Sequence, residues 1–190
     1  MLEERLPADR RASEELLPCI ERILSNAHAR LSDFNRIAVC SGPGSFTGVR
    51  VGLATAWGLG RALGVPVESV PTLEALAEAA RAPDLERVAA LLDAGRGEVV
   101  IEFFAFEKER ARSLAGTERL RIPDAAARCR GVEFVSLPED LLGLPGRALS
   151  TTPARAMAAA VARAPRPGTS EAPVAIYARS SAAEEKLGAS

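Results

Sequence analysis

The chain has 190 residues, 47% of them hydrophobic, and its 24 basic and 25 acidic residues leave a net charge of -1. This length allows one core or two small subdomains packed together. Because the arginines are scattered along the chain, the charge gives no support for autonomous binding to RNA or to an anionic membrane. Charged residues interrupt the apolar stretch 49–64 and open the chain, which argues against a membrane span and a signal peptide. Three widely separated cysteines argue against a disulfide framework and a zinc site, and they favour a reducing cytoplasm.

The first half of the chain alternates predicted helices and strands, a pattern typical of an α/β sheet. Apolar residues recur at helical spacing behind Ser13, which is a candidate N-cap, while Pro18 predicts a kink or a later helix start. The next expected elements are a buried strand at 36–40, a glycine loop, a long apolar helix, a strand at 65–70 and a helix from 72 that ends before 83.

The second half begins with two strand-like runs, 87–93 and 98–106, whose glycine-containing connection 94–97 predicts an antiparallel hairpin. A polar stretch without a clear pattern follows. The remaining expected elements are a helix at 124–130, a strand at 132–135, a loop at 138–146, a helix at 153–164 capped by Thr152, a loop at 165–173, a strand at 174–177 and a solvated tail that carries Glu184, Glu185 and Lys186.

The glycine loop joins the strand at 36–40 to the long helix. Gly42 and Gly44 allow several backbone N–H groups to face one side, where the helix N-terminus favours an anion. The spacing from Gly44 to Gly48 does not match a dinucleotide fingerprint, no lysine completes a Walker-type loop, and Ser45 lacks the sequence of a nucleophile elbow. Two interpretations remain, a phosphate contact and a tight strand-to-helix connection.

Small residues recur every fourth position along the long helix, at Gly48, Gly52, Ala56, Gly60 and Gly64. Each interior glycine costs about 1 kcal/mol relative to alanine, so close packing must compensate for this cost. The helix is apolar nearly all round and must be covered on more than one side. Either a partner protein covers what the sheet and the first helix leave open, or the helix lies fully inside the chain.

The sequence offers few candidates for a catalytic side chain, and each has a simpler structural interpretation. His28, the only histidine, is expected to cap the first helix or to face water, and Asp93 is expected to shape the hairpin turn. Cys40 is interpreted as a buried apolar residue. We therefore assign no catalytic residue and no metal ligand.

The stretch 37–76 resembles the TsaB family, also called YeaZ, above all in the run Ser41-Gly42-Pro43-Gly44-Ser45-Phe46-Thr47-Gly48-Val49-Arg50-Val51-Gly52-Leu53-Ala54. Segments 13–18, 92–99 and 173–179 are also similar to this family. The resemblance implies an α/β, actin-like and ribonuclease-H-like (ASKHA) fold whose N-terminal subdomain is truncated, with residues 2–6 as the tail of the family's third strand. Residues 1–85 would form this incomplete subdomain, 86–180 the C-terminal subdomain and 181–190 a tail.

The resemblance also implies a cytoplasmic, non-catalytic subunit that binds and stabilises TsaD, which transfers threonylcarbamoyl from its adenylate to an adenosine in tRNA. The ATPase TsaE would complete the assembly, tRNA would be reached only through the complex, and a homodimer is the alternative use of the same helices. No cofactor is expected for the chain alone, while ATP or ADP is a candidate ligand at the complex interface. The implied partner-binding residues are Leu16, Leu17, Ile20, Leu24, Val49, Gly52, Leu53, Ala56, Trp57 and Gly60, and the motif loop comprises Gly42, Pro43, Gly44, Ser45, Phe46, Thr47, Gly48 and Arg50.

The chain departs from the family pattern at its start and at a few single positions. The family opens with a hairpin whose first strand carries a phosphate-site motif, and without those strands we expect a misplaced start or a clipped chain that is less stable than a longer relative. Ala12, Gly95 and Val100 replace residues common in the family. Two other function classes stay open: a metallopeptidase, disfavoured because one histidine cannot supply paired ligands, and an autonomous ATP-binding protein, which needs two phosphate loops.

Overall fold

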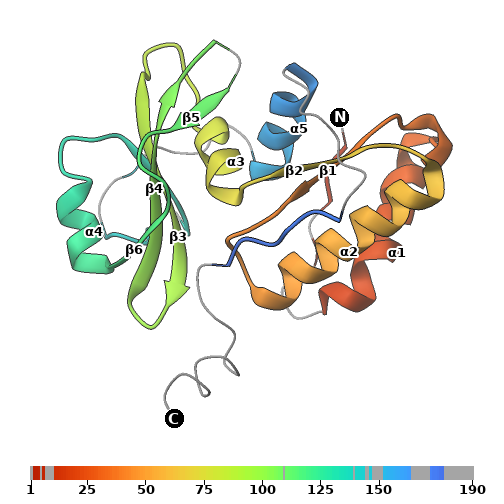
Figure 1. Ribbon diagram of the computed structural model, residues 1–190, viewed down its shortest axis with the longest axis horizontal. Helices are drawn as coiled ribbons and strands as arrows, with labels where there is room; N and C mark the ends of the chain where they lie inside the picture. The colour runs from red at the N-terminus through yellow and green to blue at the C-terminus, as the bar shows by residue number, and fades with distance from the viewer. Residues whose placement is uncertain are drawn as a thin grey trace.

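The computed structural model describes residues 2–4, 6, 11–108, 110–138, 140–143, 146, 152–163 and 172–177, and in them two β-sheets lie on either side of a short central helix (Figure 1). The first sheet pairs β1 (Ile37–Cys40) with β2 (Val67–Val70) in parallel. Strand residues alternate between the faces of a sheet. Accordingly, Val39 and Val67 approach one helix layer, while Cys40 and Val70 pack in a cluster on the opposite face.

Helices cover both faces of the first sheet. The long helix α2 (Phe46–Leu63) packs on one face, and α1 (Ala12–Ala27) packs on α2. On the other face, α5 (Pro153–Arg163) contacts β1 and α3 (Thr72–Ala79). A short 3-10 helix, η1 (Leu31–Asp33), connects α1 to β1. This layering explains why α2 is apolar nearly all round, since it lies between the sheet and α1.

The second sheet is built around a hairpin. Its strand order is β5-β4-β3-β7, and β6 also pairs with β4. The hairpin strands are antiparallel with a register shift after Asp93, whereas β7 runs parallel to β3. The bounds are β3 (Arg87–Gly95), β4 (Glu98–Phe106), β5 (Ala111–Ser113), β6 (Glu118–Arg121) and β7 (Phe134–Leu137).

Helix α3 is shared by both sheets and forms the centre of the molecule. Its Leu73 and Leu76 are fully buried in the main core beside Val88 and Val100 of the hairpin. Its Ala75 packs on the other side, in the cluster that contains residues of β2 and α5. The far face of the second sheet is covered by α4 (Ile122–Arg128). Because α3 contributes to both cores, the two sheets are held together by apolar packing.

Most of the expected elements are present. The hairpin is confirmed, and its turn has positive φ at Gly95, Arg96 and Gly97. Asp93 accepts a hydrogen bond from the Gly95 N–H at 2.7 Å, as expected of a turn former. The Thr152 hydroxyl accepts one from the Arg155 N–H at 3.3 Å, which confirms the cap of α5. His28 lies exposed at the C-cap of α1 with φ of 50°, as expected.

Two expectations about helix starts and strand positions are wrong. Helix α1 begins at Ala12, without a side-chain cap from Ser13, and it continues through Pro18. The strand expected at 132–135 lies at β7, two residues later, because its register follows the pairing with β3. Pro18 lies inside α1, so the alternative of a later helix start is excluded.

Strand predictions also failed at the termini and in the polar stretch after the hairpin. Residues 174–177 and the described residues of 2–6 do not form strands. Conversely, β5 and β6 were not expected, because they are short and mostly exposed and are defined by pairing with β4. The predictions for 165–171 and for the tail with Glu184, Glu185 and Lys186 lie outside the described residues.

The expected division of the chain at residue 85 stays a prediction. Helix α5 and residues 172–177 were expected in the second subdomain. In the structure they contact the first sheet and the loop after β1.

Across the described ranges, no helix has the length and apolar character of a membrane span, and the acidic, histidine and cysteine residues form no cluster of three that could hold a metal ion.

The small-residue face of α2 leads to a first testable prediction. A Cβ on Gly60 would clash with the Val67 side chain and lie 3.2 Å from the Val65 carbonyl oxygen, whereas a Cβ on Gly58 would meet nothing within 4 Å. Gly60→Ala should therefore lower the free energy of unfolding by about 2 kcal/mol through overpacking. Gly58→Ala should raise it by up to about 1 kcal/mol through helix propensity. Urea unfolding followed by circular dichroism checks the opposite signs, and a stabilised Gly60→Ala would contradict this packing.

Candidate functional site

The loop between β1 and α2 is held by backbone hydrogen bonds with three other parts of the chain. The Ser41 N–H donates to the Val70 carbonyl at 2.9 Å, and the Gly42 carbonyl accepts from the Thr72 N–H at 2.7 Å. The Ser41 carbonyl accepts from the Ile176 N–H at 2.7 Å. Gly42 has φ of 100°, and its peptide bond to Pro43 is cis. The loop is thus a tight connection whose backbone is bound to β2, α3 and the segment 172–177.

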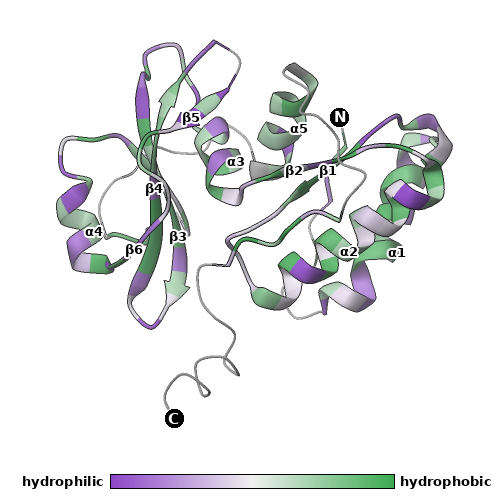
Figure 2. Ribbon diagram, in the orientation of Figure 1, coloured by the Kyte–Doolittle hydropathy of each residue, from purple (hydrophilic) through white to green (hydrophobic). Residues whose placement is uncertain are grey.

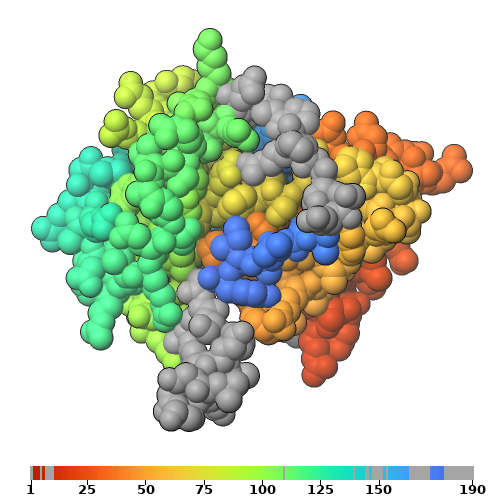
Figure 3. Space-filling model, in the orientation of Figure 1, coloured from red at the N-terminus to blue at the C-terminus, as the bar shows by residue number. Residues whose placement is uncertain are grey.

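The segment 172–177 lies across this loop, and we call it the strap. Figure 3 shows it in blue on the surface, across the middle of the molecule between α2 and the second sheet. A Cβ on Gly42 would clash with the Ile176 carbonyl oxygen, so only glycine permits this approach. The Ile176 carbonyl of the strap therefore fills the space beside Gly42 that a side chain would occupy.

An exposed aromatic and cationic cluster anchors the end of the strap to α2. The Arg50 guanidinium carbon lies 3.7 Å from the centre of the Phe46 ring, and its Nε donates to the Tyr177 hydroxyl at 2.9 Å. The Phe46 and Tyr177 rings are 5.2 Å apart. At the start of α2, the Ser45 hydroxyl accepts from the Gly48 N–H at 3.1 Å, while Gly44 and Thr47 are exposed. Within this chain, Ser45 of the motif loop caps α2, while Phe46 and Arg50 hold the end of the strap.

The ten residues implied in partner binding divide into two groups. Val49, Leu53, Ala56 and Gly60 are buried inside the chain, so a partner cannot contact them in this structure. Gly52 is half-buried, and a Cβ added to it would lie 3.7 Å from a methyl group of Val39. The small-residue ridge of α2 therefore packs on the chain's own sheet. Partner binding by these five residues of α2 stays a prediction, and in this structure they face the chain's own core.

The other implied residues remain accessible on the outer helix layer. Leu17 is 52% exposed, and Leu16, Ile20, Leu24 and Trp57 are half-buried. The Arg61 guanidinium lies 5.9 Å from the Trp57 ring. Figure 2 shows hydrophobic stretches on the ribbons of both α1 and α2. The outer layer thus keeps apolar side chains at its surface.

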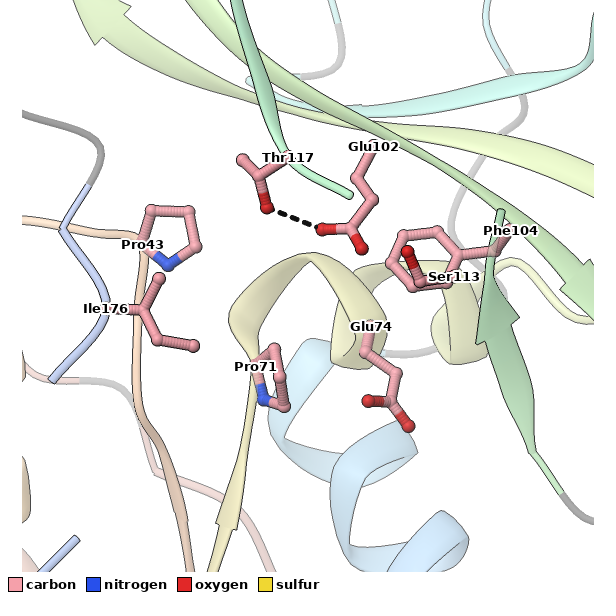
Figure 4. A pocket seen from close by; sticks show the side chains of 8 residues that line it. All are labelled: Pro43, Pro71, Glu74, Glu102, Phe104, Ser113, Thr117 and Ile176. Carbon is pink, nitrogen blue, oxygen red and sulfur yellow. Dashed lines mark hydrogen bonds between the residues drawn. The ribbon is translucent and has the colours of Figure 1, made fainter. Parts of the chain in front are cut away.

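A cavity of about 200 Å³ lies where the loop, α3, the second sheet and the strap meet (Figure 4). Its lining combines apolar and polar side chains: Pro43, Pro71, Glu74, Glu102, Phe104, Ser113, Thr117 and Ile176. The Thr117 hydroxyl donates to Glu102 Oε2 at 2.7 Å. Sequence reasoning missed this site, although a glutamate inside the apolar run of β4 was a signal that it could have used.

The cysteines are not arranged as reactive thiolates. Burial raises the pKa of Cys129 to about 11 and also raises the pKa of Cys19 and Cys40 above the ordinary value. The Cys40 thiol lies 3.5 Å from the Met157 sulfur in the apolar cluster around β2. All three side chains are thiols at neutral pH, in agreement with the interpretation of Cys40 as an apolar residue.

Comparison with known proteins gives consistent matches. Residues 7–130 match the family described as "TsaD: tRNA N6-adenosine threonylcarbamoyltransferase". The "tRNA threonylcarbamoyladenosine biosynthesis protein TsaB" of Escherichia coli (strain K12) is 41% identical over 91 residues, which are 47% of this chain and 39% of that protein. The protein of the same name from Haemophilus influenzae is 39% identical over 105 residues, or 55% of this chain and 44% of the relative. The chain thus matches less than half the length of these curated relatives.

Two solved structures agree with the observed fold. The structure described as "YeaZ from Pseudomonas aeruginosa" is 36% identical with a TM-score of 0.53, covering 58% of this chain and 52% of that one. The second is described as an uncharacterized protein with similarity to peptidase YEAZ from Pseudomonas aeruginosa. It is 28% identical with a TM-score of 0.64, and the match covers 92% of this chain and 85% of the other.

Proposed function

Because this chain belongs to the TsaB (YeaZ) family and its residues 7–130 match the family described as TsaD, we propose that it is a non-catalytic subunit in the biosynthesis of threonylcarbamoyladenosine on tRNA. The relatives in Escherichia coli and Haemophilus influenzae carry the name of this pathway. The actin-like α/β fold agrees with that family. In this proposal the chain works in the cytoplasm and contributes by binding and stabilising the catalytic subunit TsaD.

The observation that carries the proposal is the accessible apolar surface of α1. A leucine that is 52% exposed at position 17 lies on an amphipathic helix beside the half-buried Leu16, Ile20 and Leu24. Apolar side chains clustered at a surface mark interaction sites more often than single exposed ones do. Trp57 extends this surface onto α2, and tryptophan is enriched among residues that dominate binding energies.

The proposed assembly uses two features of the chain, the apolar surface of α1 and α2 and the motif loop. TsaD is the proposed occupant of the α1 and α2 surface, with TsaE and tRNA reached through the complex. A homodimer through the same helices is the competing use of this surface. ATP or ADP is proposed only at an interface with the partner, because the strap already covers Gly42 of the motif loop in the isolated chain.

Leu17→Glu tests this proposal. We expect the variant to bind purified TsaD from the same genome at least tenfold more weakly than the wild type, because the glutamate would be desolvated at the interface. Isothermal titration calorimetry measures the affinity, and circular dichroism confirms that the exposed substitution leaves the fold intact.

The matched control is Leu114→Glu. Leu114 is also a large exposed apolar residue, at 41%, but it directly follows β5 of the second sheet. We expect its affinity for TsaD to stay within twofold of the wild type. A wild-type chain that does not bind TsaD would refute the proposed function. An equal loss in both variants would place the contact elsewhere on the chain.

A further inference from the structure

Glu102 is a largely buried residue beside the cavity, and none of the residues that the structure describes gives its carboxylate a cationic partner. Glu102 is 9% exposed and stands on β4 between Val100 and Phe104, which face the same core. One oxygen of the Glu102 carboxylate accepts a hydrogen bond from the Thr117 hydroxyl. Figure 4 shows the carboxylate pointing toward the space between Phe104 and the other lining residues. Within the described ranges, no arginine, lysine or histidine forms an ion pair with it.

Two other buried glutamates show how this chain normally compensates such a charge. Glu68, 2% exposed, pairs with Arg36 at 3.1 Å. Glu78, 6% exposed, pairs with Arg81 through two hydrogen bonds of 2.7 Å. Burying a carboxylate without a cation is costly. Glu102 differs from both because its side chain lines an open cavity and has no arginine partner among the described residues.

We propose that this cavity binds a single guanidinium or alkylammonium group, whose positive charge pairs with the buried Glu102 carboxylate. The walls suit the stem of such a group, since Pro43, Pro71 and Ile176 are apolar and the Phe104 ring lies beside the carboxylate. Glu74 on α3 adds a second acidic side chain to the lining. Ser113 and Thr117 supply hydroxyl oxygens that can accept further N–H donors.

The size and charge of the cavity exclude other ligand classes. A volume of about 200 Å³ is below the range of roughly 300 to 1,000 Å³ typical of pockets for drug-sized ligands. A nucleotide would be too large, and its phosphates would be repelled by the Glu102 carboxylate. A metal ion would meet too few ligands, since the described residues hold no group of three metal-binding side chains. A single organic cation fits both limits.

The cation can come from an arginine or lysine side chain of a partner protein or from a free small amine. Propylguanidinium, n-butylammonium and capped arginine (Nα-acetyl-arginine N-methylamide) are the probes, and propylurea is the neutral control of the same shape. The methyl signals of Ile176 and Thr117 in NMR spectra of the isolated chain report binding, because both residues line the cavity. This test needs no TsaD, so its outcome is separate from that of the proposed function.

We expect the two simple cations to shift both methyl signals in a saturable manner and propylurea to shift them at least tenfold more weakly. Capped arginine binding as tightly as propylguanidinium would identify a protein side chain as the source. Binding tenfold weaker would identify a free amine. Equal responses to propylguanidinium and propylurea would overturn the proposal, and this comparison uses only the wild-type chain.

Glu102→Gln removes the charge while keeping an oxygen for the Thr117 hydroxyl. We expect it to bind propylguanidinium at least tenfold more weakly than the wild type. Glu86→Gln is the control, because Glu86 is an exposed residue that precedes β3 and does not line the cavity. It should bind within twofold of the wild type. Unchanged binding by a folded Glu102→Gln variant would refute the role of the carboxylate.

Discussion

Arg81→Met should lower the free energy of unfolding by about 3 kcal/mol, because it removes the Arg81 guanidinium from the buried carboxylate of Glu78. Glu78 accepts two hydrogen bonds of 2.7 Å from the Arg81 guanidinium and a third from the backbone N–H of Ala111. These contacts tie α3 to β5 at the edge of the second sheet. Arg81 also stacks over Phe106, with 4.5 Å between its guanidinium carbon and the ring centre.

Arg112→Met is the matched control for this substitution. Arg112 pairs with Glu107 at 2.5 Å, but both side chains are more than half exposed. Exposed ion pairs contribute about 0 to 1 kcal/mol, so this variant should unfold within about 1 kcal/mol of the wild type. Urea unfolding of both variants measures the difference. Equal losses would show that burial of Glu78 does not determine the strength of its pair.

Gly42→Ala should lower the free energy of unfolding by about 3 kcal/mol and release the strap. The positive φ of Gly42 is unfavourable for alanine by about 1 to 2 kcal/mol, and the new methyl group would clash with the Ile176 carbonyl oxygen. The Ile176 N–H, which donates to the Ser41 carbonyl, should exchange with solvent faster in this variant. Hydrogen exchange at this amide and urea unfolding measure both effects.

Gly64→Ala separates the two causes. Gly64 ends α2 with φ of 67°, and a Cβ there would meet nothing within 4 Å. This variant should therefore carry only the backbone cost of about 1 to 2 kcal/mol and leave exchange at Ile176 unchanged. If Gly42→Ala costs no more than Gly64→Ala and keeps the Ile176 amide protected, the strap does not pack on Gly42 as described.

Much of the fold could be predicted because several elements have strong local patterns. The apolar strand Ile37–Cys40, the long helix after the loop and the glycine-flanked hairpin are encoded within short windows of sequence. β5 and β6 could not be predicted in this way. Their residues are mostly exposed, and they are strands only because β4 offers them backbone partners.

The candidate site shows the same division. The glycine motif is conspicuous in the sequence, and its Ser45 cap and its place before α2 follow from local rules. The sequence left open whether a partner or the chain itself covers the small-residue face of α2, and in the structure Gly60 of this face packs against Val67 of the same chain. Helical periodicity identifies a face suited to close packing, but it does not identify the neighbour.

The amino-acid sequence alone determined the family, the α/β class and the two apolar helices that remain the proposed docking surface. Only the tertiary structure decided which sides of those helices are exposed, that the strap lies on Gly42, and that Glu102 borders a cavity. The physical reason is the distance along the chain over which the interactions act. Helix caps and strand alternation depend on neighbours within a few residues, whereas burial and charge pairing depend on segments that are far apart in the chain and are brought together by the fold, as in the bond from Ile176 to Ser41.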